Sequence, residues 1–282
     1  MPEATTRRVA FTLQRTARYV VLTILTLVMV FPFVWIISSS LKGDVEVIAY
    51  PPTIVPKAVT IGAYLTIFRD YAFGKYFTNS FVIATGATAL SLVVGSLAAY
   101  SFSRLRFPGD QLLLLSLLGA LMVPSIVLII PLYVILNMLG MIDTHIGTIL
   151  VNCSYCVPLV AWMMRGFFST IPGELEDAGR IDGCSYLGVL FRIVVPLSAP
   201  GLAASAIFIF LVVWNEFLFA LVFTMETAKT LPVITSEFIG VFEISWSQLA
   251  AAAVTTSVPI LVFILVFQRK LISGLTQGAI KG

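Results

Sequence analysis

The chain has 282 residues, of which 59% are apolar and only 11% are charged, with a formal net charge of +3 and three cysteines. Soluble domains contain about 45–50% apolar and about 25% charged residues. A soluble globular enzyme is therefore excluded, as are a disordered chain and a disulfide-rich secreted scaffold. The small and scattered charge also argues against nucleic-acid binding, so the composition predicts an integral membrane protein.

Six stretches are long and apolar enough to cross a bilayer, because a helix needs about 20 apolar residues to span a hydrocarbon layer of roughly 30 Å. In chain order they cover residues 19–41, 77–102, 111–136, 148–168, 197–224 and 249–267. The predicted fold class is therefore all-α, a polytopic membrane protein with six transmembrane helices.

The basic residues predict the orientation of these spans, because cytoplasmic segments retain Lys and Arg. The basic residues of the proposed inner side are Arg7, Arg8, Arg15, Arg18, Arg104, Arg106, Arg165, Arg180, Arg192, Arg269, Lys270 and Lys281. Those of the outer side are Lys42, Lys57, Arg69, Lys75 and Lys229. Both termini are therefore predicted to be cytoplasmic.

Three parts follow from this orientation. We expect a cytoplasmic N-terminal segment over residues 1–18, a membrane domain over residues 19–271 and a cytoplasmic tail over residues 272–282. The first span is too long for a signal peptide and lacks a clear cleavage site, so it is expected to remain as an anchor helix.

Two longer segments are expected on the outer side. The segment 42–75 contains several prolines and mixed charges, which favours an ordered loop or short strands over a separate domain. The segment 225–248 is also polar and ends near Trp246. Both segments are long enough to meet an external partner.

The segment 171–196 carries the strongest local signals. Pro172 and the acidic residues Glu174, Glu176 and Asp177 predict the start of a short helix, because proline lacks a donor that is not needed there and acids complement the helix dipole. Gly183 is expected to turn the chain into a second short helix.

The small residues Ala178, Gly179 and Gly183 are expected to leave one surface of this segment free of bulk. Such a compact knob suits the groove of another protein. An amphipathic interfacial helix without a partner explains the spacing equally well.

Polar residues inside the spans are candidates for a translocation pathway. A charge at the centre of a span costs about 2.5–3.5 kcal/mol, so Glu216 should face protein or a wet cavity, and Asn215 beside it extends this polar patch. Asn152 and Tyr155, with His145 near them, could contact a hydroxylated solute, although hydrogen bonding between helices is favoured.

Several other patterns point to packing rather than chemistry. Cys153 and Cys156 have the spacing of a redox or metal site but lie in an apolar span without companion ligands. The small residues Ser91, Gly95 and Ala99 recur every four positions and predict close helix packing. The sequence contains no zinc-hydrolase or serine-nucleophile motif, so catalysis by this chain is not expected.

The segment 177–196 resembles the coupling motif in the membrane subunits of bacterial ATP-binding-cassette importers. That motif is Glu-Ala-Ala, three residues, Gly, nine residues, and Ile-x-Leu-Pro. This chain has Asp177-Ala-Gly179, then Gly183, then Ile193-Val-Val-Pro196 at the same spacing. The departures at Asp177, Gly179 and Val195 preserve charge, small size or apolar character.

Two further segments are similar to the carbohydrate-uptake branch of this family, of the maltose and glycerol-3-phosphate type. They are Trp214-Asn-Glu-Phe217 and the chain end over residues 274–282. The resemblance covers essentially the whole chain and implies the type I importer permease fold.

The resemblance implies that a short coupling helix docks in a cleft of a cytoplasmic ATPase. The residues expected to carry this coupling are Glu176, Asp177, Ala178, Gly179, Arg180, Asp182, Gly183, Ile193 and Pro196. Gln277 and Lys281 of the tail are candidates for a second ATPase contact.

The resemblance also implies the partners: a homodimeric ATPase, a second homologous permease and an extracytoplasmic solute-binding protein or lipoprotein. This chain has no Gly-x-x-x-x-Gly-Lys-Ser/Thr loop, so it is expected to bind no cofactor, and ATP and Mg are expected on the ATPase. The expected function is that of a non-catalytic subunit, surrounded by membrane lipid, that imports a sugar or sugar-like solute across a bacterial cytoplasmic membrane.

Two alternatives remain from the residues alone. One is a self-contained, proton-coupled secondary transporter that uses Glu216 as its proton carrier. The other is a membrane scaffold that transports nothing.

Overall fold

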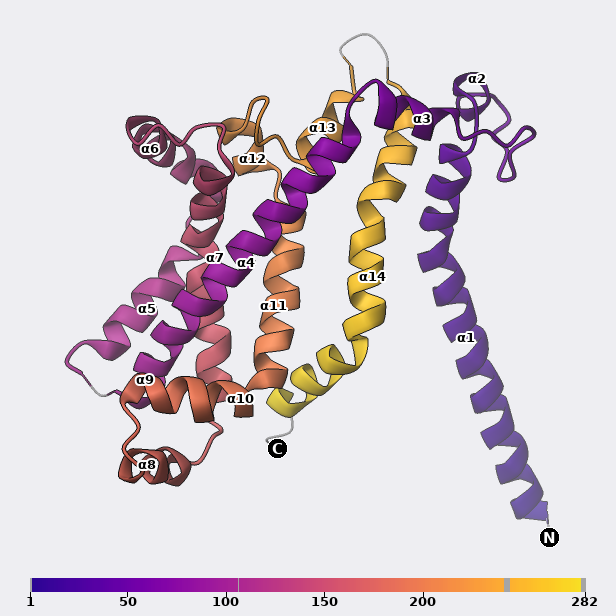
Figure 1. The fold of residues 1–282 in the computed structure, drawn as a ribbon. Coiled ribbons are helices and arrows are strands. Elements are labelled where there is room, and N and C mark those ends of the chain that lie inside the picture. The colour runs from indigo at the N-terminus through magenta and orange to yellow at the C-terminus, as the bar shows by residue number, and fades with distance from the viewer. Residues whose placement is uncertain (1, 106, 241–243, 280–282) are drawn as a thin grey trace. The chain divides into compact units, whose positions relative to one another are not determined.

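The computed structural model describes the backbone of residues 2–105, 107–240 and 244–279, and side chains between residues 14 and 266 within these ranges (Figure 1). In this part of the chain the elements are helices, and β pairing is limited to one bridge between Ile239 and Ile244. The all-α prediction is therefore confirmed. The helices divide into two units, Met1–Tyr71 with Phe238–Thr255, and Ala72–Glu237 with Thr256–Gly282.

The first unit contains α1 (Pro2–Ser40), which continues through the expected boundary at residue 18 and past Pro32 without a break. Its apolar part, Gln14–Ser40, is long enough to span a membrane. The described side chains of residues 14–34 are exposed in this chain. This apolar helix therefore presents its surface to lipid or to another protein.

The segment after α1 is an ordered loop with two short helices, α2 (Asp44–Val47) and α3 (Gly62–Arg69). Lys42 Nζ donates to the carbonyl of Thr53, and Glu46 Oε1 accepts a hydrogen bond of 2.8 Å from the backbone N–H of Lys57. That backbone donor holds the pKa of Glu46 below its ordinary value. The expected ordered loop is present, but its regular elements are helices rather than strands.

The long helix α14 (Trp246–Ala279) begins in the first unit and continues in the second. Near its start, the hydroxyl of Ser247 donates to Asp44, the first residue of α2. The region Trp246–Val266 is long and apolar enough to cross a membrane.

The second unit is built around α4 (Phe73–Arg104) and α7 (His145–Phe168), which pack along each other (Figure 1). Gly95 permits this approach, because a Cβ added there would lie 2.6 Å from the Cβ of Val160. Ser91 Oγ lies 3.4 Å from Cys153 Sγ, and Ala99 is fully buried. The packing role predicted for the small residues is confirmed.

The helix α11 (Ala199–Trp214) packs against both α4 and α7. Trp214 is 1% exposed, and its ring lies 5.6 Å from that of Phe77 on α4. Two shorter helices follow, α12 (Leu218–Phe223) and α13 (Leu231–Glu237). Aromatic packing thus joins α11 to α4.

The third predicted span is not one straight helix. It consists of α5 (Asp110–Ala120) and α6 (Ser125–Met138), which meet at an angle of 99°. Pro124 directly precedes α6, and a proline disfavours helical backbone in the residue before it. Each half is shorter than the roughly 20 residues that a membrane crossing requires.

The fifth predicted span is also interrupted. It contains α11 and α12 with a break at residues 215–217. Before it, the run of α9 (Tyr186–Val189), η1 (Leu190–Val194) and α10 (Val195–Leu197) meets α11 at 82°. In the described residues, four helices are long enough to cross a membrane, or up to six if each bent pair counts as one span.

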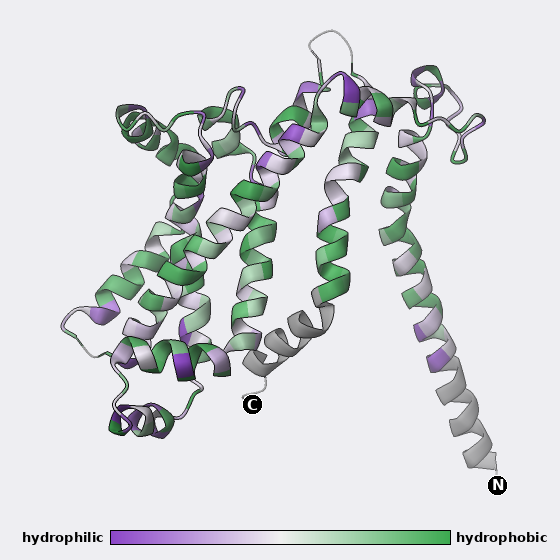
Figure 2. Cartoon of the chain, viewed as in Figure 1, coloured by the Kyte–Doolittle hydropathy of each residue, from purple (hydrophilic) through white to green (hydrophobic). Residues whose placement is uncertain are grey.

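Hydropathy follows this arrangement. Figure 2 shows hydrophobic residues along α1, α4, α11 and the described part of α14, and hydrophilic residues gathered on α8 (Gly173–Ile181). The polar helix α8 therefore stands out from the apolar helices of its own unit.

Candidate functional site

The helix α8 forms the predicted knob. It begins directly after Pro172, carries Glu174 and Glu176 in its first turn, and ends before Asp182. In Figure 1 it lies beyond the ends of α4 and α7, next to α9 and α10. The predicted helix start is therefore confirmed.

The turn after α8 depends on Gly183, whose φ is +87°. The N–H of Gly183 donates to the carbonyl of Arg180, and that of Cys184 donates to the carbonyl of Gly179, each at 3.0 Å. This pair of bonds is a Schellman motif, in which glycine is favoured because it adopts the left-handed conformation without strain. The side chain of Ser185 then accepts from Gly188 and caps α9, which confirms the predicted second helix.

The predicted coupling residues divide between two faces of this segment. Glu176 and Gly179 are buried, and Ile193 is half-buried. The exposed residues of the predicted set are Asp177, Ala178, Arg180, Asp182, Gly183 and Pro196. The segment is therefore held to its own chain on one side and open on the other.

Gly179 uses its small size within the chain. A Cβ placed there would clash with the side-chain end of Ile193 in η1. Ala178 is exposed, and a Cβ at Gly183 would meet open space. The expectation of a bare surface for a partner's backbone therefore applies to Ala178 and Gly183 but not to Gly179.

The open face combines charge with apolar surface. Ile181 is 86% exposed, and Arg180 lies with its guanidinium carbon 4.4 Å from the ring centre of Tyr186. An open groove of about 500 Å³ lies on this face. It is lined by Asp177, Arg180, Ile181, Cys184, Ser185 and Tyr186. Tyr186 and Leu187 are also exposed, at 50% and 58%, so Ile181 is not a lone apolar side chain on this face, and exposed apolar surface rimmed by polar residues marks protein-contact sites.

Two residues that sequence analysis did not assign to the site hold the inner face of α8. Arg104 Nε donates to Glu176 Oε1 at 2.5 Å, and the hydroxyl of Tyr100 donates to Glu176 Oε2 at 3.0 Å. In the sequence, Arg104 is one of the basic residues that predict the orientation of the spans. Its position at the end of an apolar span indicates a residue at the membrane boundary. The sequence does not reveal that its partner, Glu176, lies 72 residues later in the chain.

The candidate pathway residues Asn152 and Tyr155 contact each other on α7. The hydroxyl of Tyr155 donates to Asn152 Oδ1 at 2.7 Å, and Asn152 Nδ2 donates to the carbonyl of Thr148 at 2.8 Å. Both hydrogen bonds lie within α7. The prediction that Asn152 and Tyr155 form hydrogen bonds between helices is therefore wrong. His145 does make such a contact, with its Nε2 lying 2.8 Å from Asn79 Oδ1 of α4.

Asn215 and Glu216 lie at the break between α11 and α12. Glu216 Oε1 accepts from the backbone N–H of Phe219 at 2.7 Å, and Oε2 accepts from that of Ala220 at 3.0 Å. Asn215 is exposed and donates to the carbonyl of Leu211. The ring of Tyr155 lies 5.9 Å from that of Phe219, so the two predicted polar pairs are close in space.

The remaining candidates from the sequence are the two cysteines of α7 and the two residues of the C-terminal tail. Cys153 and Cys156 are buried free thiols, and in the residues that the structure describes no cluster of metal ligands occurs. Lys281 lies outside the described residues, and Gln277 lies in the part of α14 whose side chains are not described.

The start of the segment 225–248 is held by a second network that sequence analysis missed. The carboxylate of Asp143 accepts hydrogen bonds from the backbone N–H groups of residues 225–228, at 2.8–3.1 Å. These donors hold the pKa of Asp143 well below its ordinary value. From α4, Asn79 Nδ2 donates to the carbonyls of Thr227 and Lys229.

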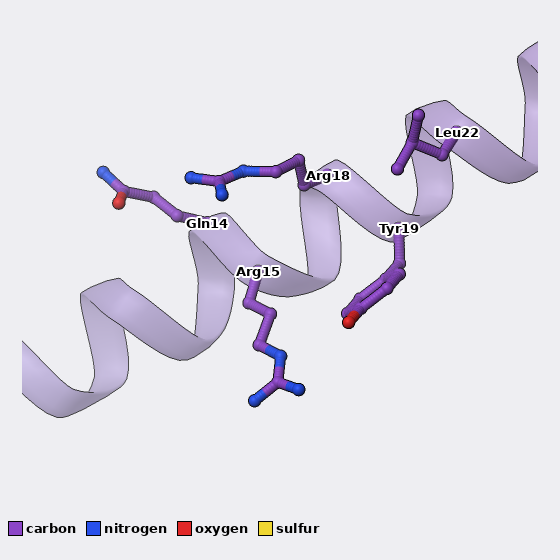
Figure 3. A pocket seen from close by; sticks show the side chains of 5 residues that line it. All are labelled: Gln14, Arg15, Arg18, Tyr19 and Leu22. Carbon is purple, nitrogen blue, oxygen red and sulfur yellow. The ribbon is translucent and has the colours of Figure 1, made fainter. Parts of the chain in front are cut away.

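A further hollow lies on α1, where Figure 3 shows its five lining residues. They are Gln14, Arg15, Arg18, Tyr19 and Leu22. All come from two turns of one helix, with side chains pointing in different directions (Figure 3). This hollow is therefore the groove between side chains of an exposed helix, with no converging polar groups.

The chain resembles known transport proteins over most of its length. Residues 91–276 match the family described as binding-protein-dependent transport system inner membrane component. The chain is 36% identical over 266 residues to the sulfoquinovosyl glycerol transport system permease protein of Agrobacterium fabrum, covering 94% of this chain and 93% of that protein. It is 39% identical over 254 residues to the trehalose transport system permease protein of Mycobacterium tuberculosis, covering 89% and 92%.

A solved structure supports the fold. A bacterial ABC transporter involved in the import of the acidic polysaccharide alginate matches with a TM-score of 0.76 at 21% identity, over 90% of this chain and 95% of that chain. The importer-permease fold implied by the coupling motif is thereby confirmed. The chain belongs to the family of inner membrane components of binding-protein-dependent transport systems.

Proposed function

We propose that this chain is the permease subunit of an ATP-driven importer that moves a sugar or sugar-like solute into the cytoplasm. The observation that carries this proposal is the two-sided placement of α8. Its inner face is fixed by Glu176 and Gly179, and its outer face offers Asp177, Arg180 and the 86% exposed Ile181. A helix held in this way can transmit the movement of a bound partner to the rest of its chain.

The partner at α8 is a cytoplasmic ATPase, which binds ATP and Mg and acts as a dimer. The exposed charges favour correct docking, and the exposed apolar side chain gains by burial. Closure of the ATPase dimer displaces α8 and switches the side from which the pathway opens. In this arrangement both termini and α8 lie in the cytoplasm.

A second, homologous permease completes the pathway. The apolar residues of α1 are exposed over a full membrane span, and the α5–α6 pair also exposes large apolar side chains such as Leu112 and Ile130. Lipid covers part of such surface, and a second permease covers the remainder. Asn215, at the break after α11, provides an exposed polar group for a hydroxylated solute.

The cargo class follows from the relatives. Two of them are named for sulfoquinovosyl glycerol and trehalose, and a third, 36% identical over 263 residues, is a trehalose/maltose transport system permease protein of Thermococcus litoralis. A binding protein delivers this cargo on the outer side. The loop at residues 225–228, fixed by Asp143, is the contact that we assign to it.

Energised uptake tests the proposal. Cells that carry or lack this chain are compared for uptake of labelled trehalose and maltose, and right-side-out membrane vesicles are then loaded with ATP and given the binding protein. We expect chain-dependent uptake that needs internal ATP and persists when an uncoupler removes the proton gradient. Uptake that needs the gradient but not ATP would favour the secondary transporter, with Glu216 as proton carrier.

A further inference from the structure

The cluster of Arg104, Tyr100 and Glu176 joins α4 to α8. Glu176 comes from α8, and both other residues come from the last turns of α4. The side chain of Glu176 is 8% exposed and that of Arg104 is 21% exposed. Both oxygens of the carboxylate are used, one by the guanidinium and one by the phenol.

Arg104 also holds the end of α7. Its Nη2 donates to the carbonyl of Phe168 at 2.9 Å and to that of Ile171 at 2.7 Å. Phe168 is the last residue of α7, and Ile171 lies in the turn that leads to α8. One guanidinium therefore ties α4, the end of α7 and the inner face of α8.

The shape of arginine matters for this arrangement. Its planar guanidinium directs several N–H groups along fixed directions, whereas the lysine ammonium is a compact charge on a flexible stem. Hydrogen bonds with an ionised partner are also shorter and stronger than neutral ones. Solvent and salt screen a partly buried contact of this kind much less than a surface ion pair.

A second contact connects α8 to η1. Gly179 packs against Ile193 of η1, and η1 leads through α10 to α11. Movement of α8 thus has two routes into the unit, a polar one to α4 and α7 and an apolar one toward α11. The polar route engages the closely packed α4–α7 pair.

We propose that Arg104, Tyr100 and Glu176 form the joint through which displacement of α8 moves α4 and α7. They are positioning residues of the transport cycle, and the inference rests on the proposed docking of α8 to an ATPase. Glu176 therefore contributes to coupling from inside the chain, whereas Asp177 and Arg180 contact the partner.

The test separates assembly from transmission in the complex purified from its native cells. All versions carry Ser154→Cys, which places an exposed reporter thiol in the middle of α7, where the native Cys153 and Cys156 are buried. Alkylation of residue 154 by N-ethylmaleimide is followed by mass spectrometry, without nucleotide and with ATP plus EDTA. The amount of ATPase per permease and the rate of ATP hydrolysis with Mg are measured on the same samples.

The joint variants are Arg104→Lys, Glu176→Gln and Tyr100→Phe, each close in size to the native residue. Arg165→Lys is the matched control, because Arg165 is exposed and donates over 3.4 Å to the carbonyl of Phe102 across the same helix pair. We expect ATP to change the alkylation rate in the wild type and in the control. In Arg104→Lys and Glu176→Gln that change falls by about fivefold or more, with ATPase recovery and hydrolysis retained.

The combined variant Arg104→Lys/Glu176→Gln should be no worse than Arg104→Lys alone, because Glu176→Gln removes a contact that Arg104→Lys already disrupts. A purely structural role would instead lower ATPase recovery in parallel with the response. Full ATP responses in the variants would overturn the joint, and so would a wild-type rate that ATP does not change. Absence of an ATPase from the wild-type complex would refute the proposed function itself, which is a distinct result.

If Arg104→Lys and Glu176→Gln do not assemble with the ATPase, the Tyr100→Phe variant tests the joint. It removes one hydrogen bond and leaves the ion pair in place. A reduced ATP response with normal assembly supports the joint, and an unchanged response contradicts it.

Discussion

Asp143 accepts the backbone N–H of Thr227 with both carboxylate oxygens, at 3.1 and 2.9 Å, across 84 positions of the chain. The N–H of Asp143 in turn donates to the carbonyl of Phe223 at 2.9 Å. Asp143 has a positive φ of 56°, so its backbone is shaped to meet this loop. The turn between α6 and α7 thus fixes the loop that follows α12.

Asp143→Asn should loosen this loop without unfolding the protein. An amide has one acceptor oxygen and presents its NH₂ group to backbone donors, so the expected loss is about 1–3 kcal/mol of local stability. Hydrogen–deuterium exchange at the amides of residues 225–228 measures it. Asp110→Asn is the control, because Asp110 accepts a bond from its neighbour Gln111. Unchanged exchange in Asp143→Asn would contradict the assigned role.

The same loop should be insensitive to mild acid. The pKa of Asp143 is well below its ordinary value because backbone N–H groups stabilise the ionised form. A group with a lowered folded pKa contributes stability that is complete above the unfolded value, near 4, and is lost only as the pH falls through the folded value. Exchange at residues 225–228, corrected for intrinsic rates, should therefore be constant between about pH 7 and pH 5. Opening of the loop near neutral pH would count against this.

Gly95→Ala should destabilise the α4–α7 pair. The added Cβ would lie 2.6 Å from Val160 Cβ and 3.1 Å from the carbonyl oxygen of Val157, so backbone must move. Overpacking of this kind costs about 1–3 kcal/mol. Gly166→Ala in α7 is the control, since its Cβ meets nothing within 4 Å, and it should stabilise the helix slightly. Thermal unfolding in detergent measures both variants, and a Gly95→Ala protein as stable as Gly166→Ala would contradict the tight packing of α4 on α7 at Gly95.

Substitutions of Gly183 should follow backbone strain rather than size. A residue with a Cβ pays about 1–2 kcal/mol in the left-handed region, asparagine pays less, and β-branched residues pay most. Exchange at the amide of Cys184, which closes the turn onto Gly179, should rise in the order Gly, Asn, Ala, Val. Equal exchange in all four would show that the positive φ of Gly183 is not required.

The sequence predicts the long helices and the knob because both have local signals. Apolar runs of sufficient length give α1, α4, α7 and α14, and the proline, acidic residues and glycine define α8 with its turn. A bend within an apolar stretch leaves no such signal in the hydropathy of the sequence. The 99° bend between α5 and α6 lies inside a continuous apolar stretch, where only Pro124 marks it.

The site is predicted less completely than the fold, for a physical reason. Which face of α8 points inward depends on Arg104, 72 residues earlier in the chain, and a pattern within α8 does not contain that information. Glu176 and Asp177 look equivalent in the sequence as neighbouring acids. In the structure, the first is buried against α4 and the second is exposed.

Substitutions on the exposed face of α8 test directly whether this helix docks to an ATPase. Tagged wild-type chain, Ile181→Arg and Val45→Arg are purified in mild detergent from native cells, and the accompanying chains are quantified. Val45 is the matched control, because it is a β-branched residue, 83% exposed, in the short helix α2. We expect an ATPase dimer and a second permease with the wild type and with Val45→Arg, and loss of the ATPase in Ile181→Arg. Equal ATPase recovery in all three, or no ATPase with the wild type, would contradict the docking of α8.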